Sequence, residues 1–208
     1  MTSGTRIEKA GVRGFVHQPE GDSGRGLVLT HGAGGNCTAP LLVEVAKRFS
    51  AAGVWVLRCD LPFRQRRASG PPSPATAAGD RAGLRAAVEV LRESAPGSIY
   101  LGGHSYGGRQ ATMLAADEPD VAAGLLLFSY PLHPPGKPEQ LRTAHFPRLR
   151  LPTVFVHGTR DSFGSLEKLQ LAITEIPGPV RIIPVEGAGH DLRRGRFDLG
   201  SIVAALFE

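Results

Sequence analysis

The chain has 208 residues, of which 41% are hydrophobic and 21% charged, and its formal net charge is +5. These proportions are typical of a folded globular domain and exclude a disordered chain. No apolar run is long enough to span a bilayer, and Met1 to Arg6 lack the apolar core of a signal peptide. We therefore expect one domain over residues 1–208 and a cytoplasmic location.

Cysteine and charge patterns exclude several classes of function. The two cysteines, Cys37 and Cys59, and the seven histidines show no metal-ligand spacing, so we expect no disulfide scaffold, metal or cofactor. Arginines cluster at 64–67 and 193–196. We interpret both clusters mainly as solvated surface, with anion binding as the alternative. Without interleaved aromatic residues they do not predict a nucleic-acid partner.

Apolar spacing predicts strands and helices that alternate along the chain. The expected elements are, in order, an edge hairpin of strands 6–10 and 14–18, a strand at 27–30, a helix at 41–49, a strand at 54–57, a helix at 84–91, a strand at 98–101, a helix at 108–117, a strand at 121–129, a short helix at 139–143, a strand at 153–156, a helix at 166–176, a strand at 180–185 and a helix at 199–207. This alternation predicts an α/β fold with a mostly parallel, twisted sheet and helices on both faces.

The strand expected at 98–101 leads into Gly103-His104-Ser105-Tyr106-Gly107. This sequence fits G-x-S-x-G, the sharp strand-to-helix turn that holds a serine hydroxyl clear of a sheet. Glycine is needed at both ends because a Cβ would clash with the neighbouring backbone. In a chain with 27 glycines the pentapeptide can arise by chance, so its place between a strand and a helix carries the interpretation.

A serine nucleophile needs a base and an acid that orients the base. The chain supplies Asp161 and His190, each just after a predicted strand, in the order Ser, Asp, His of α/β-hydrolases. We expect His190 to accept the Ser105 proton and Asp161 to hold the imidazole. Read alone, Asp161 also fits a helix N-cap. Asp60 is an alternative acid for which we favour a loop-structuring role, and Asp191 is poorly placed to face the ring.

Two backbone N–H groups are expected to stabilise the oxyanion that forms during acyl transfer. One is the N–H of Tyr106, directly after the serine. The other comes from the loop 31–35, where we favour Ala33 and place Gly34 next. Their side chains should matter through size alone. The loop lacks the spacing of phosphate-binding or dinucleotide-binding motifs, which disfavours those ligands.

The other histidines near this site receive supporting roles. We expect His31 and His104 to brace loops rather than to carry protons. His157 is expected at most to support the turn at Asp161. His133 and His145 are expected to line the substrate entrance.

The chain resembles α/β-hydrolases over nearly its whole length. More narrowly, it resembles the KANL/Tex-type hydrolase-like family, whose relatives include dienelactone-hydrolase-like proteins. The residues that carry this resemblance are 31–35, 129–138, 141–142 and 158–161. The resemblance implies an α/β-hydrolase fold with a triad at Ser105, Asp161 and His190. Dienelactone hydrolases use a cysteine nucleophile, so their substrate does not carry over to a chain with a serine.

Only about 23 residues separate Ser129 from Thr153, where related folds insert a lid domain. We therefore expect no large lid and a shallow, open site. The predicted function is a serine hydrolase that cleaves carboxylic esters or thioesters of small acyl groups through an acyl-enzyme. The alternative is a non-catalytic protein that keeps the fold as a binding surface or scaffold. The expected partner is a small-molecule substrate.

Overall fold

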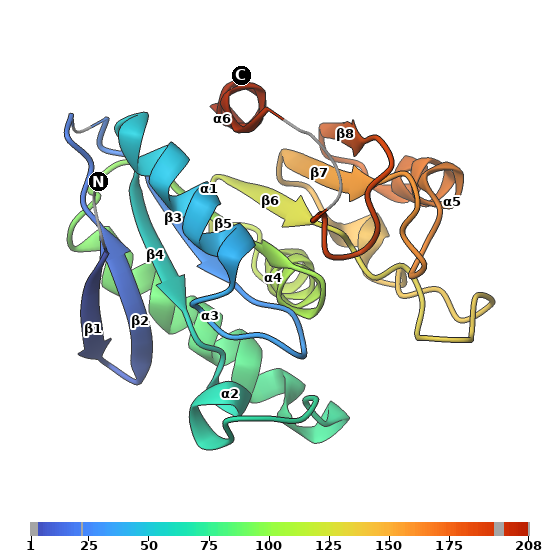
Figure 1. Ribbon diagram of the computed structural model, residues 1–208, viewed down its shortest axis with the longest axis horizontal. Helices are drawn as coiled ribbons and strands as arrows, with labels where there is room; N and C mark the ends of the chain where they lie inside the picture. The colour runs from blue at the N-terminus through green and yellow to red at the C-terminus, as the bar shows by residue number, and fades with distance from the viewer. Residues whose placement is uncertain (1–3, 22, 194–197, 208) are drawn as a thin grey trace.

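The computed structural model describes residues 4–21, 23–193 and 198–207, which contain one eight-stranded sheet (Figure 1). The strand order is β1-β2-β4-β3-β5-β6-β7-β8. Strand β2 pairs antiparallel with β1 and β4, and the other neighbours are parallel. The strands are β1 (Thr5–Lys9), β2 (Val12–His17), β3 (Gly26–Thr30), β4 (Trp55–Cys59), β5 (Ile99–His104), β6 (Gly124–Phe128), β7 (Thr153–Gly158) and β8 (Val180–Val185). The predicted edge hairpin and parallel sheet are thus confirmed.

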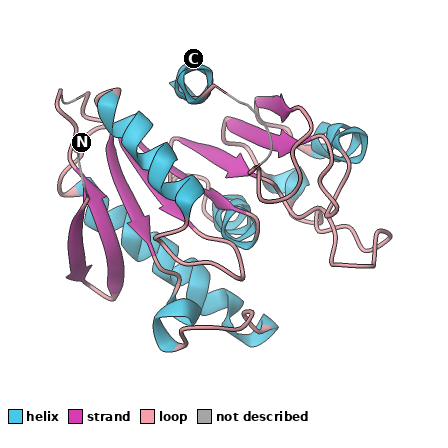
Figure 2. Cartoon of the chain, in the orientation of Figure 1, coloured by secondary structure: helices cyan, strands magenta, loops and turns pink. Residues whose placement is uncertain are grey.

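Helices cover both faces of the sheet (Figures 1 and 2). They are α1 (Pro40–Ala51), α2 (Pro62–Arg66), α3 (Ala77–Arg92), α4 (Tyr106–Asp117), α5 (Leu166–Ala172) and α6 (Leu199–Phe207), with short 3-10 helices η1 (Pro74–Thr76), η2 (Phe146–Arg148) and η3 (Ile173–Glu175). The apolar faces of α1 and α6 pack in one core cluster, and those of α3, α4 and α5 in another. None of the helices in the described ranges is long and apolar enough to cross a membrane.

Strand β3 shows why the central strands read as continuous apolar runs. All five of its residues are buried because helices lie on both sides of the sheet. Leu27 and Leu29 face the α1 and α6 side, while Val28 between them faces the α3 side. The same burial on both faces occurs in β6. These strands form a rigid layer whose carboxyl ends carry the polar residues of the site.

Two local predictions need correction. A short helix, α2, follows β4, whereas the sequence between residues 57 and 84 predicted no helix and, up to about Pro74, a loop rich in proline, serine and arginine. The helix predicted at 139–143 is absent, and the turn of helix in this region lies at Phe146–Arg148. The backbone of Arg142 bonds across the segment instead, with its N–H donating to Leu132 O at 2.8 Å and its carbonyl accepting from the Tyr130 hydroxyl at 2.7 Å. The connection between β6 and β7 therefore folds as a strap without a large lid.

Candidate active site

Ser105 occupies a strained turn between β5 and α4. Its φ of 52° and ψ of −116° are unfavourable for a residue with a Cβ. The two glycines of the motif allow the turn to close. A Cβ on Gly103 would lie 2.8 Å from the Thr30 carbonyl oxygen, and one on Gly107 would lie 2.6 Å from that of His31. The packing thus requires glycine at both motif positions and holds the serine at the carboxyl end of the sheet.

The structure brings Ser105, His190 and Asp161 into hydrogen-bond contact. His190 Nε2 lies 2.7 Å from Ser105 Oγ. His190 Nδ1 lies 2.8 Å from Asp161 Oδ2 and 3.0 Å from Oδ1. Because a carboxylate accepts the Nδ1–H, the lone pair of Nε2 faces the serine hydroxyl. His190 follows β8 and Asp161 follows β7, so adjacent parallel strands deliver the base and the acid to the same edge.

The Asp161 side chain is fully buried, and its carboxylate is held by backbone as well as by His190. Oδ1 accepts a hydrogen bond from the Phe163 N–H at 2.8 Å. His157 lies with Nε2 3.8 Å from Asp161 Oδ2 and 2.8 Å from the Gly164 carbonyl oxygen, to which it donates. His157 therefore supports the turn after β7, as the sequence predicted, and does not contact His190.

Two rings hold the His190 imidazole from its sides. The Phe163 ring centroid lies 4.2 Å from that of His190, and the His104 centroid lies 5.3 Å away. His104 Nε2 also bonds the His190 carbonyl oxygen at 2.8 Å, so this nitrogen carries the proton. Burial lowers the pKa of His104 to about 4, and the ring is therefore neutral at pH 7. His104 positions His190 without adding positive charge next to it.

The glycine-rich loop 31–35 lies directly against the serine. A Cβ on Gly32 would lie 3.3 Å from Ser105 Cβ. The Gly32 carbonyl oxygen accepts from His31 Nδ1 at 2.8 Å and from the Gly35 N–H at 3.0 Å. In a planar trans peptide the N–H of Ala33 points away from that carbonyl. The side chain of His31 thereby sets the direction of the Ala33 N–H, one of the two predicted oxyanion donors.

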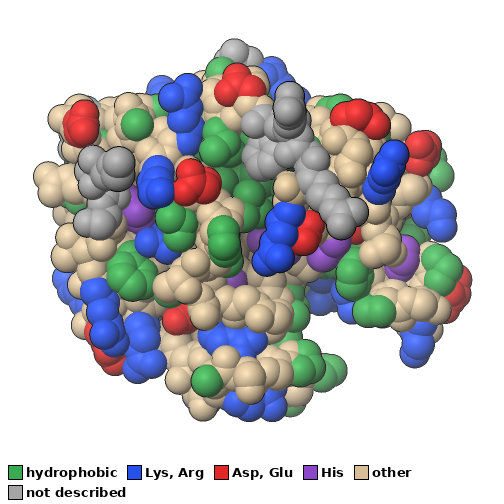
Figure 3. Space-filling view, in the orientation of Figure 1, with side chains coloured by type: hydrophobic (Ala, Val, Ile, Leu, Met, Phe, Trp, Pro, Cys, Tyr) green, Lys and Arg blue, Asp and Glu red, His purple; other side chains and the backbone are tan. Residues whose placement is uncertain are grey.

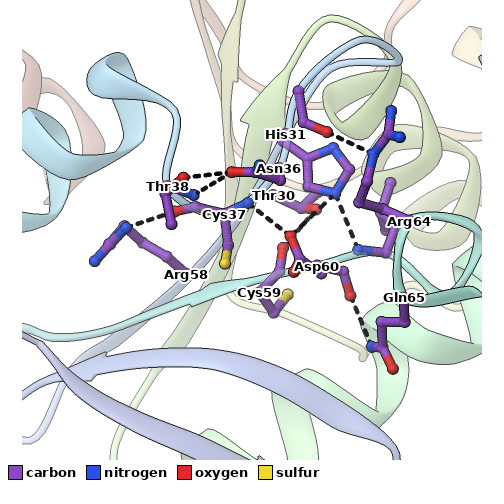
Figure 4. A network of polar contacts seen from close by, with 12 residues as sticks. Thr30, His31, Asn36, Cys37, Thr38, Arg58, Cys59, Asp60, Arg64 and Gln65 are labelled. Atoms are coloured by element: carbon purple, nitrogen blue, oxygen red, sulfur yellow. Dashed lines mark hydrogen bonds and ion pairs between the residues drawn. The ribbon is translucent and has the colours of Figure 1, made fainter. Parts of the chain in front are cut away.

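His31 is a buried, neutral histidine whose tautomer is fixed by its neighbours. Its Nε2 accepts a hydrogen bond from the Leu61 N–H at 3.1 Å, so the proton resides on Nδ1. Burial lowers the pKa of the imidazole. Figure 4 shows the ring between the side chains of Asp60 and Arg64. The bracing role predicted for His31 agrees with these contacts.

Arg64 is a residue of the site that the sequence analysis misjudged. It belongs to a cluster interpreted as solvated, yet it is 6% exposed. Its guanidinium donates to the carbonyl oxygens of Ala33 and Gly35, each at 2.8 Å, and to those of Gly70 and Arg67 at 3.1 Å. The first two bonds fix the peptide planes of the loop beside Ser105. Arg64 therefore ties α2 to that loop.

Tyr106 contributes both its backbone and its side chain. Among the described residues, neither its N–H nor that of Ala33 has an acceptor, so both are available to a ligand. The Tyr106 hydroxyl donates to Asp80 Oδ2 at 2.8 Å, and Asp80 Oδ1 accepts from the Phe63 N–H at 2.9 Å. Burial and this bond raise the pKa of Tyr106. The expectation that its side chain matters through size alone is wrong.

Comparison with known proteins identifies the family of this chain. A family model described as an alpha/beta hydrolase domain matches residues 23–199. The chain belongs to the alpha/beta-hydrolase family.

Solved structures with this hydrolase fold are similar over nearly the whole chain. An alpha-beta serine hydrolase homologue from Coxiella burnetii has a TM-score of 0.76 at 19% identity, over 98% of this chain and 95% of the other. A dienelactone hydrolase from Anabaena variabilis has a TM-score of 0.73 at 17% identity, over 98% and 94%. A serine hydrolase without a lid from Xanthomonas campestris has a TM-score of 0.73 at 16% identity, over 98% and 91%. These likenesses show the fold.

The remaining candidate acids of this hydrolase lie outside the contact with His190. Asp60 Oδ1 accepts from the Cys37 N–H at 2.7 Å and so structures the loop after β3, as expected. Asp191 accepts from the Arg193 N–H at 3.1 Å. Of the acidic residues considered from the sequence, Asp161 is the one that bonds His190.

His133 and His145 do not line the pocket, contrary to expectation. Each is 7% exposed. His133 Nδ1 bonds the Pro134 carbonyl oxygen at 2.9 Å, and His145 Nε2 lies 2.8 Å from Thr112 Oγ1 on α4. Both histidines stabilise the strap between β6 and β7, which packs them inward.

The hydrolase carries a cavity of about 1110 Å³ in front of Ser105. Its walls come from the loop 31–35, from Pro71 to Pro74, and from Pro131, Pro135 and Arg142 of the strap. Figure 3 shows the surface hollowed between the lobe that carries α2 and the lobe that carries the strap. The site opens to solvent without a lid domain, but it is roomier than a shallow site, because proline-rich connections on both sides rise above the sheet.

Proposed function

We propose that this alpha/beta hydrolase is a serine hydrolase that cleaves carboxylic esters or thioesters. The observation that carries the proposal is the continuous contact from Asp161 through His190 to Ser105, with distances of 2.8 and 2.7 Å. A serine hydroxyl becomes a competent nucleophile only with a base in such contact and an acid that orients the base. Ser105 also holds the strained backbone that raises its side chain above the sheet.

In the proposed first half-reaction, Ser105 Oγ attacks the carbonyl carbon of the substrate. The hydroxyl proton moves to His190 Nε2, and the Asp161 carboxylate stabilises the imidazolium that forms. The N–H groups of Ala33 and Tyr106 donate to the carbonyl oxygen as it gains negative charge. Collapse of this intermediate expels the alcohol or thiol, which takes its proton from His190, and leaves an ester on Ser105.

The second half-reaction uses the same groups with water as the nucleophile. His190 accepts a proton from water as the water oxygen attacks the acyl carbon. The bond to Ser105 Oγ breaks, His190 returns the proton to the serine, and a carboxylic acid leaves. The cavity volume, about 1110 Å³, accommodates acyl groups larger than the small ones predicted from the short strap.

Labelling with a fluorophosphonate and hydrolysis of 4-nitrophenyl acetate test the proposal together. The wild-type chain should form a stoichiometric adduct on Ser105 and release 4-nitrophenol with an initial burst. Ser105→Ala should be neither labelled nor able to hydrolyse the ester. His190→Ala should have a kcat/KM at least about a thousandfold lower than wild type. Ser73 offers a matched control, because it lines the same pocket but bonds neither His190 nor Asp161. Ser73→Ala should be labelled normally.

The alternative of a non-catalytic scaffold gives the opposite result. A folded chain with the same contacts but no reactive serine would remain unlabelled at probe concentrations that modify other serine hydrolases. Turnover that survives in Ser105→Ala would overturn the assignment of the nucleophile.

A further inference from the structure

Two arginines, Arg109 and Arg142, line the cavity that contains Ser105. Arg109 is the fourth residue of α4, and its N–H donates to the Ser105 carbonyl oxygen at 3.0 Å. Four residues of helix rise about 6 Å, so the side chain starts one turn away from the serine. Arg142 lines the cavity from the strap, which packs against α4 through η2.

Neither guanidinium has an acidic partner in the described part of the chain. The two acidic residues that line the same cavity already have basic partners. Glu44 pairs with Lys47 at 2.9 Å, and Asp191 pairs with Arg193 at 3.5 Å. The cavity therefore holds two positive charges that no carboxylate balances.

The surroundings of Arg109 and Arg142 are costly for unpaired cations. Arg109 Nε is buried, and no acceptor for it lies within the ranges that the structure describes. Burial lowers the pKa of Arg142, and the nearby charge of Arg109 lowers it further. Burial and the same Arg109 charge also lower the pKa of His145 to about 4, so this neighbour is neutral at pH 7. Like charges are thus kept close together in a partly buried place, which favours an anion between them.

The strap holds Arg142 in a fixed position. Its backbone bonds both Leu132 and Tyr130, at 2.8 and 2.7 Å. The Tyr130 ring is fully buried against Phe146 and Phe155. The unusual sequence at 129–138 therefore has a definite structural role, because it anchors the backbone of a cavity-lining arginine. An arginine that is already held in position loses less conformational entropy when it binds a ligand.

We propose that Arg109 and Arg142 bind a carboxylate carried by the substrate, so that the enzyme favours esters or thioesters that bear a free carboxylate. The inference rests on the proposed function for the reacting group and adds the substrate class. Guanidinium groups suit carboxylates because they donate paired hydrogen bonds in a planar fork. The same cavity is also lined by Met113, Pro131 and Phe163, whose apolar side chains can contact methylene groups of a substrate.

The 4-nitrophenyl hemiester of adipic acid and its methyl-capped diester test whether Arg109 and Arg142 bind a carboxylate on the acyl group of the substrate. The wild-type enzyme should show at least about a tenfold higher kcat/KM for the hemiester in low salt, and added salt should reduce this preference. Arg142→Met and Arg109→Met should each reduce the ratio of the two kcat/KM values about tenfold. Arg150→Met removes an exposed arginine that does not line the cavity and should leave the ratio unchanged.

A second pair of probes tests whether the arginines instead bind a carboxylate on the alcohol part of the substrate. If the carboxylate belongs to the leaving group, 4-acetoxybenzoate should be preferred over its methyl ester, with the same dependence on the two arginines. Equal turnover of charged and neutral probes in both pairs would overturn the inference while leaving serine hydrolysis intact.

Calorimetric titration of Ser105→Ala with adipate measures carboxylate binding by the two arginines independently of catalysis. Binding should be measurable in this variant and at least about tenfold weaker when Arg142→Met or Arg109→Lys is added. Binding that is insensitive to both arginine changes, or absent, would contradict the proposal even if the wild-type enzyme turns over esters. Failure of Ser105 to react with a fluorophosphonate would instead contradict the proposed function alone.

Discussion

Arg64 Nη2 lies 2.8 Å from the carbonyl oxygen of Ala33. The bond joins α2 to the loop that faces Ser105, and it orients the peptide plane between Ala33 and Gly34. A second bond from the same guanidinium, to the Gly35 carbonyl oxygen, fixes the peptide between Gly35 and Asn36. A buried arginine thus holds the backbone of this loop in place beside Ser105.

Replacement of Arg64 by methionine should lower kcat about tenfold to a hundredfold with little change in KM. In the proposed mechanism the loop N–H groups bind the oxyanion more strongly than the ground-state substrate, so a displaced loop lowers kcat more than it raises KM. Rates should be normalised to the fraction of enzyme that a fluorophosphonate labels, which removes the effect of misfolded protein. Arg64→Lys should recover part of the loss. Arg66→Met, on the exposed side of the same helix, is the matched control. A normalised kcat equal to wild type would show that Arg64 serves stability alone.

Arg64 also shows what the sequence could not predict. Its partners are four carbonyl oxygens in loops whose paths depend on the whole fold, and no side-chain pattern encodes carbonyl positions. In the sequence, Arg64 therefore looks the same as Arg66 and Arg67, which are exposed. The strands and helices themselves, in contrast, follow from apolar spacing within short windows, and Ser105, Asp161 and His190 follow from their places after strands. The order of the strands in the sheet does not follow from such spacing.

Asp80, in contrast, has a sequence pattern that indicates its buried contact. It precedes Leu84 by four residues, so it lies on the same face of α3 as the apolar residues. A fully buried carboxylate on such a face needs hydrogen-bond donors, and Tyr106 and the Phe63 N–H supply them. An acidic residue in register with an apolar face is thus a usable signal of a buried polar contact.

Tyr106→Phe should destabilise the protein by about 1–3 kcal/mol, because it removes a donor from the buried Asp80 carboxylate. The backbone N–H at position 106 remains in this variant. We therefore expect only a small decrease in kcat, even though the free energy of unfolding falls. Urea unfolding and steady-state kinetics measure the two effects. Tyr100→Phe is the control, since its hydroxyl bonds no residue in the described ranges and its ring packs on Phe207. Equal unfolding free energies for both variants would contradict the role of Asp80.

His145 should make stability depend on pH between about 6.5 and 4. Burial, then the charges of Arg109 and Arg148, lower its folded pKa to about 4 from 6.5. As the pH falls through this window, the unfolded chain binds a proton on His145 and the folded chain does not. The free energy of unfolding therefore decreases, by at most about 1.4 kcal/mol per pH unit from this group.

His145→Asn provides the comparison, because its amide can still meet Thr112 while it does not titrate. Urea unfolding at pH 7, 6 and 5 should show a shallower loss of stability in the variant than in wild type. Buried His104 titrates in the same direction and remains in both proteins, so the difference reports His145. Parallel pH profiles would contradict the lowered pKa.

The loop 31–35 offers a paired test of how closely it approaches Ser105. An added Cβ at Gly32 would lie 2.9 Å from His104 Nδ1 and 3.3 Å from Ser105 Cβ, whereas one at Gly34 would meet nothing within 4 Å. Gly32→Ala should therefore push the loop and its Ala33 N–H away from the serine and lower kcat/KM at least about tenfold. Gly34→Ala should stay within about threefold of wild type, and circular dichroism should confirm that both variants fold. Equal losses in the two variants would mean that loop flexibility, rather than its contact with Ser105, controls the rate.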